Sequence, residues 1–142
     1  MSYANGGMEP LFYRIALFDT RYQRKASEDF GFQMNREKDL DMLDPNFKKR
    51  LKDADKNNIY DEPTGLFKVA DPHLDIFLVV IVDRILQSNG DAATKAYKDG
   101  NKCDAIRKQA QESLVPMGEV RSPFMWGATR IFMKSENGSE RD

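Results

Sequence analysis

The run Ile76-Phe-Leu-Val-Val-Ile-Val82 is the feature that most constrains how this chain can fold. It is far shorter than the roughly 20 apolar residues that a membrane-spanning helix needs. Its many β-branched residues favour a strand, and the absence of polar positions is typical of a strand that lies inside a sheet. The run therefore predicts a central strand that is buried on both faces.

Two further segments carry the alternating pattern of strands. In residues 10–18 apolar and more polar positions alternate, and the same period of two returns at Phe30, Phe32 and Met34. These two segments predict a hairpin-like pair of strands joined by an exposed basic loop. A last strand is expected over residues 125–133.

Two segments have helical spacing instead. In "LDPNFKKRLKDAD" Asp44 can cap a helix and Pro45 suits its first turn. In "CDAIRKQAQESL" apolar residues recur at a spacing of four, and Pro116 and Gly118 end that second helix. The apolar stripe of the first helix is narrow, so it is expected to lie on the surface and to pack on one side only.

These elements predict an α+β, β-rich fold: an antiparallel sheet or partial β-sandwich with two or three peripheral helices. With 142 residues, the chain fits one domain. We expect a single β-rich domain or domain fragment over residues 9–134, with a charged helical insertion at 36–63. The ends at 1–8 and 135–142 are expected to be disordered. About five strands are few for a sandwich of about seven, which favours a fragment.

Charge and cysteine content restrict the setting. Lysine and arginine number 22 against 23 aspartates and glutamates, so a net charge of −1 argues against a nucleic-acid partner. One cysteine allows no intrachain disulfide, and the opening residues lack the pattern of a signal peptide. The sequence predicts a cytoplasmic chain, with peripheral membrane contact as a further option.

No grouping of residues predicts catalysis, a cofactor or a metal. Asp53-Ala-Asp55-Lys-Asn57 begins like a calcium loop, but the glycine and final glutamate of such loops are missing. His73, the only histidine, stands in "DPHLD" and is interpreted as a loop residue. Cys103 and His73 fall in separate loops and form no nucleophile-base pair. The chain is therefore expected not to be an enzyme.

Two segments are candidates for contacts with other molecules. Arg21, Arg24 and Lys25 of the basic loop could touch acidic lipid or a partner, although a solvated hairpin loop explains them equally well. In "VRSPFMWGATRIF", the aromatic residues Phe124, Trp126 and Phe132 are candidates for packing between domains. Whether this segment closes the core or forms an interface stays open at the level of sequence.

Three stretches, in order and together covering most of residues 9–133, resemble one family. They are "EPLFYRIALFDTRYQRKASEDFGFQMN", "DPHLDIFLVVIVDRILQ" and "VRSPFMWGATRIF". They are similar to motifs of the dedicator-of-cytokinesis (DOCK) exchange factors, in particular the zizimin-like or a related subgroup. Ala26 and Val120 depart from the usual isoleucine and tyrosine of these motifs, and residues 36–63 show little likeness.

The resemblance implies a non-catalytic scaffold segment upstream of the family's lipid-binding domain, within a guanine-nucleotide exchange factor for Rho-family GTPases. Such a segment would contact neighbouring domains of a larger chain, and would reach the GTPase only through an exchange domain absent from these residues. The alternative is a stand-alone peripheral membrane or protein-interaction module. Neither the GTPase nor the oligomeric state follows from the sequence.

Overall fold

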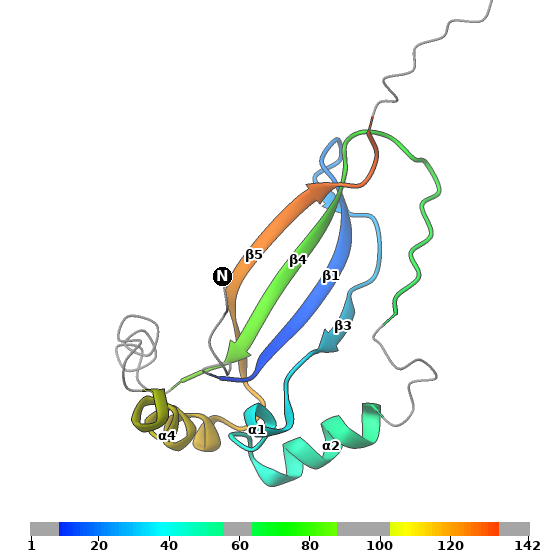
Figure 1. The fold of residues 1–142 in the computed structure, drawn as a ribbon. Helices are drawn as coiled ribbons and strands as arrows, with labels where there is room; N and C mark the ends of the chain where they lie inside the picture. The colour runs from blue at the N-terminus through cyan, green and yellow to red at the C-terminus, as the bar shows by residue number, and fades with distance from the viewer. Residues whose placement is uncertain (1–8, 56–63, 88–102, 134–142) are drawn as a thin grey trace, which may run out of the picture.

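The computed structural model describes residues 9–55, 64–87 and 103–133, and in these residues the strands form one antiparallel sheet (Figure 1). The sheet has the order β2-β1-β4-β5, and β3 pairs with the same edge of β1 as β2 does. The strands are β1 (Leu11–Asp19), β2 (Arg24–Lys25), β3 (Phe30–Gln33), β4 (Ile76–Ile85) and β5 (Arg121–Arg130).

The pair β1–β4 forms the centre of the sheet. It runs in unbroken register from Leu11 opposite Arg84 to Asp19 opposite Ile76. The strands expected at 10–18 and 76–82 are thus confirmed. Asn35 also holds the first residue of β1. Its side chain accepts a hydrogen bond from the Leu11 N–H at 2.8 Å and donates one to the Leu11 carbonyl at 2.7 Å.

Burial of β4 on both faces was a wrong expectation. Ile76, Val82 and Ile85 are buried, but the residues from Phe77 to Ile81 are only half-buried. The reason is that β1 and β5 shield β4 from the sides, while no second layer of described residues closes over its middle. A continuous apolar run therefore marks a central strand here without marking a fully buried one.

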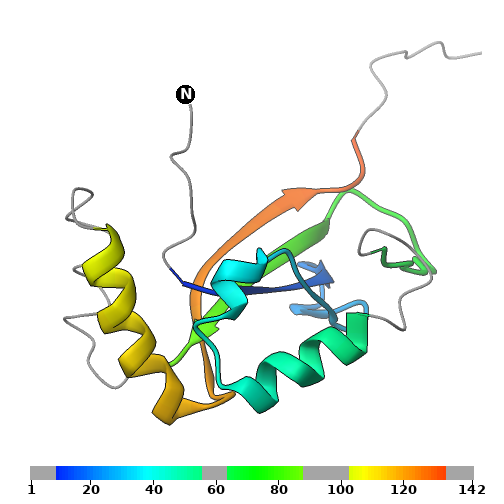
Figure 2. The same ribbon diagram turned by 60° about the horizontal axis from the view of Figure 1, so that its bottom comes forward.

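Helices gather at one end of the sheet, where α1 (Glu37–Leu40), α2 (Pro45–Asp55) and α4 (Cys103–Leu114) lie (Figure 2). Asp44 caps α2 as expected, because its carboxylate accepts hydrogen bonds from the N–H groups of Asn46 at 3.0 Å and Phe47 at 3.1 Å. A 3₁₀ turn, η1 (Val115–Met117), follows α4.

The hydrophobic core lies between these helices and the sheet. The rings of Phe12 and Phe47 stack with centroids 5.8 Å apart, and Ile85 and Leu114 are almost fully buried beside them. The remaining members of the cluster are Leu40, Met42, Leu43 and Ala110. Much of the core therefore comes from residues 36–55, and α2 packs on one side as the sequence indicated. That residues 36–63 are an insertion stays a prediction.

Strand β5 begins four residues earlier than expected and ends three earlier, at Arg130. Its pairing with β4 is irregular between Val82 and Asp83, where Met125 and Pro123 are the successive partners and Phe124 is the extra residue. Pro123 has no N–H to donate to a neighbouring strand. A bulge on an edge strand accommodates such a proline.

The described residues confirm an α+β, β-rich fold, and they form a single sheet with three α-helices rather than a sandwich. The expected disordered ends, the residues 56–63 and most of the calcium-like loop lie outside the described residues. No described helix is long and apolar enough to cross a membrane.

Candidate interaction surface

One side of the sheet, called the helix face here, carries both the core and an uncovered region. Cross-strand partners point to the same side and alternate along each strand, so Phe12, Val79, Ile81, Asp83 and Ile85 share this face. The helices cover its lower end, at Phe12 and Ile85. Beyond Asp83 the face continues without that cover.

We call this uncovered region the open half. It consists of apolar and aromatic side chains from three neighbouring strands: Ala16 and Phe18 of β1, Phe77, Val79 and Ile81 of β4, and Trp126 and Ala128 of β5. Ala16 is buried between its neighbours, Phe18 and the three β4 residues are half-buried, and Trp126 is 75% exposed.

The open half is hollowed on both sides of the ridge formed by Val79 and Ile81. A depression of about 370 Å³ lies toward Arg14, Lys25 and Asp29. Another of about 400 Å³ lies toward Pro123 and Trp126. Concave apolar surface with polar groups at its rim is typical of a place where another molecule or domain packs.

An ion pair separates the two halves of the helix face. Arg14 donates to both oxygens of Asp83, from Nε at 2.6 Å and from Nη2 at 3.1 Å, and the Asp83 side chain is only 5% exposed. The hydrogen bond to Asp83 raises the pKa of Arg14, with attraction to Asp83 and Asp29 adding to it. The pair satisfies a buried charge where the apolar core ends.

Arg121 lies just below this pair, with its guanidinium 3.9 Å from the centroid of the Phe12 ring and 5.7 Å from that of Phe47. Burial lowers the pKa of Arg121, and the neighbouring Arg14 lowers it further, against the attraction of Asp83. Stacked on the Phe12 ring, Arg121 lies against the edge of the core on the side of β5, although the residue as a whole remains exposed. No pattern in the sequence indicated a role for this residue.

The aromatic residues of the terminal segment have different positions. Trp126 stands exposed in the open half, so it does not close the core. Phe124, at the bulge, lies half-buried under the guanidinium of Arg84 at 5.1 Å, and Phe132 is half-buried after the end of β5. The structure thus leaves Trp126 on the surface, whereas Phe124 packs within the molecule. Packing of all three between domains stays a prediction.

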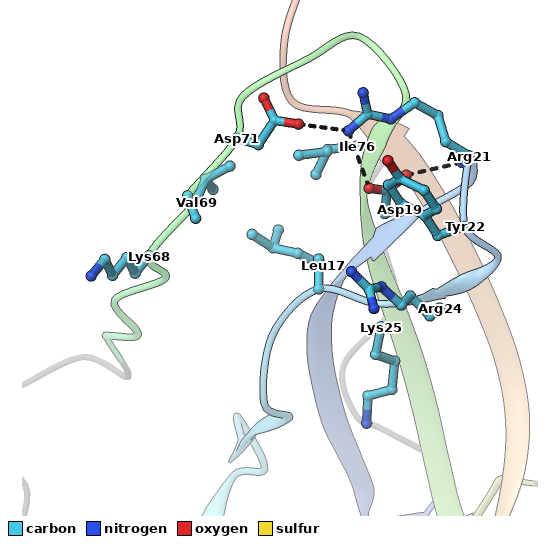
Figure 3. Close-up of a pocket in the computed structure, with 12 residues that line it drawn as sticks. Leu17, Asp19, Arg21, Tyr22, Arg24, Lys25, Lys68, Val69, Asp71 and Ile76 are labelled. Atoms are coloured by element: carbon cyan, nitrogen blue, oxygen red, sulfur yellow. Dashed lines mark hydrogen bonds and ion pairs between the residues drawn. The ribbon is translucent and has the colours of Figure 1, made fainter.

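The predicted basic residues line a pocket (Figure 3), at the end of the sheet that lies opposite the helices in Figure 1. The pocket has about 480 Å³ and brings Arg21, Arg24 and Lys25 together with Lys68, which sequence reasoning missed. Lys68 lies 43 residues after Lys25, and nothing in its local sequence indicates that the chain returns to the hairpin turn.

Carboxylates neutralise part of this positive charge. Arg21 pairs with Asp71 at 2.9 Å and with Asp19 at 3.4 Å, and the bond to Asp71 is the main cause of its raised pKa. Lys25 pairs with Asp29 at 2.7 Å. Arg24 lies over the exposed ring of Tyr22 at 5.2 Å. The turn is therefore less positive than its sequence suggests.

His73 is part of this end of the molecule as a structural residue. Its Nδ1 accepts a hydrogen bond from the Asp75 N–H at 3.2 Å, so its Nε2 carries the proton and donates to Asp19 at 3.1 Å. Burial alone would raise the pKa of Asp19, but the hydrogen bonds from Arg21 and His73 outweigh it and lower the pKa. The interpretation of His73 as a loop residue agrees with this position.

No metal site emerges from the described residues, since none of their histidines, cysteines and carboxylates form a group of three that could hold an ion. The expectation that Cys103 falls in a loop was wrong, because Cys103 is the first residue of α4. Its side chain is outside the described set, so a pairing with His73 is not tested. The arrangement offers surfaces for contact: an apolar half-face, a free strand edge and a partly neutralised basic pocket.

Comparison with known proteins gives a consistent set of relatives. The chain is 28% identical to dedicator of cytokinesis protein 9 of Mus musculus over 148 residues, and 28% identical to dedicator of cytokinesis protein 7 of Homo sapiens over 147 residues. Each match covers 95% of this chain. Dedicator of cytokinesis protein 8 of Homo sapiens is 29% identical over 84% of the chain.

The chain spans about 7% of the length of the curated relatives it matches. No protein-family model matches the sequence, and no solved structure matches it. The relatives are differently numbered dedicator of cytokinesis proteins. The matches therefore support membership of that family, but they resolve no subgroup within it.

Proposed function

Because this chain belongs to the dedicator-of-cytokinesis family, we propose that it is a non-catalytic scaffold segment of a guanine-nucleotide exchange factor for Rho-family GTPases. The observation that carries the proposal is the open half, a hollowed apolar surface with Trp126 75% exposed, in a chain that matches only about 7% of its relatives. Such a surface suits a neighbouring domain of a longer protein.

In this proposal the segment contributes no chemistry of its own. Its described residues pair their buried charges with one another, as Arg14 does with Asp83 and Asp39 with Arg107 at 2.9 Å. The GTPase would be engaged by an exchange domain elsewhere in the longer protein. Assignment to the region before the lipid-binding domain, and to a zizimin-like subgroup, rests on the motif resemblance.

The first test is nucleotide release. The chain is added in excess to Rho-family GTPases of the Rac and cell-division-control types loaded with a fluorescent GDP analogue. The expected release rate equals that of the GTPase alone, with chelation of Mg²⁺ as the positive control. Acceleration by the chain would contradict a non-catalytic role.

The second test asks whether the open half is covered in a longer protein. Hydroxyl-radical footprinting is carried out on this chain and on a protein that contains it with its flanking domains. Phe18 and Phe77, both half-buried in the open half, are expected to lose reactivity in the longer protein. Leu66, which is 99% exposed away from this face, is the control. Equal reactivity of Phe18 and Phe77 in both proteins would disprove docking on the open half.

A second candidate function, peripheral membrane binding, is favoured by the pocket that joins Lys68 to the predicted basic loop. Within the described part of the chain no carboxylate pairs with Arg24 or Lys68, so these two carry the free positive charge. Two such charges contribute roughly 1 kcal/mol each near an anionic surface. Weak binding to vesicles is the expected result.

Flotation with vesicles rich in anionic lipid tests this alternative. Arg24→Gln together with Lys68→Gln should abolish flotation, whereas Lys49→Gln with Lys108→Gln, at exposed helix positions, should not. Absence of flotation by the unaltered chain at low salt would dismiss the membrane function and leave the scaffold proposal unaffected.

A further inference from the structure

We propose that the outer edge of β5, from Trp126 to Arg130, pairs with the same edge of a second copy of this chain, antiparallel and centred on Ala128. The inference does not depend on the proposed function, because it concerns pairing through the backbone edge of β5 and not docking of a domain on the open half, although Trp126 and Ala128 belong to both surfaces. Its basis is the hydrogen-bonding pattern of β5, the lack of edge protection and the self-complementary order of the residues.

The hydrogen-bonding pattern shows which groups point outward. β5 is the last strand of the sheet, and the Ile131 N–H donates to the Ile76 carbonyl at 3.4 Å. Inward and outward residues alternate in an antiparallel pair, so Thr129, Gly127 and Met125 bond to β4. Trp126, Ala128 and Arg130 therefore present their N–H and C=O groups at the free edge.

Among the residues that the structure describes, nothing gives this part of the edge the usual protection. Natural edge strands are blocked by proline, by bulges, by inward charges or by a covering element. In β5 the proline and the bulge, at Pro123 and Phe124, both lie below Met125. Above them Trp126, Gly127, Ala128 and Thr129 are exposed, and Arg130 at the end is the only charge. Gly127 adds no side chain to this stretch, and a Cβ built there meets nothing within 4 Å, so no described residue covers the sheet surface at this point.

A second copy fits the edge residue by residue. When two β5 strands pair antiparallel about Ala128, Trp126 faces the second copy's Arg130, and Gly127 faces its Thr129. Each Arg130 then lies beside an indole, the aromatic group that attracts a guanidinium most strongly. The two small Ala128 side chains meet at the symmetry axis, and no like charges stand opposite each other. A two-fold interface of this type is closed, so assembly stops at the dimer.

The same arrangement sets the strength of the pairing. Five residues on each side are a small contact compared with the roughly 1,600 Å² of a standard interface. The dimer is therefore expected to be weak for the isolated chain, with dissociation at micromolar to millimolar concentration. Pairing would extend the sheet across both copies and place the two open halves on the same side.

Sedimentation velocity tests the stoichiometry from roughly 10 µM to 1 mM, the range expected for a small interface. The unaltered chain should shift from monomer to dimer as concentration rises. Ala128→Lys places two ammonium groups at the symmetry axis and should keep the chain monomeric. Ala70→Lys, at another exposed alanine with the same change of charge, should dimerise normally. A monomer at every concentration, or equal dimerisation of both variants, would overturn the proposal.

Oxidative crosslinking tests the register, in a chain with Cys103→Ser. Opposite residues of a hydrogen-bonded antiparallel pair have Cα atoms about 5.5 Å apart, within the range of a disulfide. Ala128→Cys should therefore crosslink to a covalent dimer. Thr129→Cys should not, because two copies of residue 129 would be about 8 Å apart in this register. Equal crosslinking at both positions, or none at Ala128→Cys, would show that the strands do not pair about Ala128.

Discussion

The two halves of the helix face use the same strands and the same kinds of residue but have different surroundings. At the lower end Phe12 is 2% exposed and stacks on Phe47, whereas Phe18, six residues along the same strand and on the same face, is half-buried in the open half. The difference comes from α1, α2 and α4, which cover only one end. Apolar residues on the helix face therefore stabilise the isolated chain at one end and remain available for contacts at the other.

Truncation of the two phenylalanines gives the largest expected difference. Phe12→Ala should destabilise the chain by about 3–5 kcal/mol, because it leaves a cavity between the sheet and the helices. Phe18→Ala removes the same atoms from a half-buried site and should cost less than half as much. Urea unfolding followed by circular dichroism measures both. Equal losses would mean that the two halves do not differ in packing.

Much of the covered end could be predicted from the sequence. The alternation in β1 and the cap at Asp44 are local signals, and both describe the structure correctly. What could not be predicted is the extent of the cover. Whether a helix covers Val79 depends on the length and direction of the segments that join the helices to the strands. The residue pattern of β4 itself contains no information about those segments. The same limitation hid Lys68, which reaches the basic pocket through the path of residues 64–71.

Trp126 shows why the candidate site was harder to predict than the fold. A large aromatic residue in an apolar segment is equally consistent with a core and with an interface. The bulge at Phe124 sets the face on which Trp126 lies, because one extra residue moves the following side chains to opposite faces. Neither the presence of the bulge nor its position can be read from "RSPFMW".

The boundary between the halves gives the next prediction. Asp83→Asn removes the carboxylate that pairs with Arg14 and should lower the free energy of unfolding by about 1–2 kcal/mol, since the aspartate is buried but the arginine is partly exposed. Asp29→Asn is the matched control, because Asp29 is 37% exposed and contacts Arg14 only at 3.9 Å. Its expected effect is below about 0.5 kcal/mol. If Asp29→Asn lowered the free energy of unfolding as much as Asp83→Asn does, the Arg14–Asp83 ion pair would not be the contact that stabilises this boundary.

Acid titration tests the far end of the sheet, where the polar contacts of Asp19 lie beside the buried Leu17 and Ile76. The folded state lowers the pKa of Asp19, so Asp19 stabilises the fold above its unfolded pKa of about 3.9, and this contribution is lost as the pH falls through the folded pKa. Asp19→Asn should be less stable than the unaltered chain at pH 7, and the two should converge in acid. Melting temperatures between pH 2 and pH 7 measure this, and parallel curves would contradict a role for the Asp19 carboxylate.

The smallest expected effect is that of Trp126→Ala in the isolated chain. An indole that is 75% exposed contributes little packing, so the free energy of unfolding should change by no more than about 0.5 kcal/mol. The same substitution should weaken any contact made through the open half or the β5 edge, where Trp126 is the largest exposed group. The measurement is a pair of urea unfolding curves at low protein concentration, where the chain is monomeric. A loss comparable to that of Phe12→Ala would place Trp126 in the core, and the distinction between a covered and an open half would no longer hold.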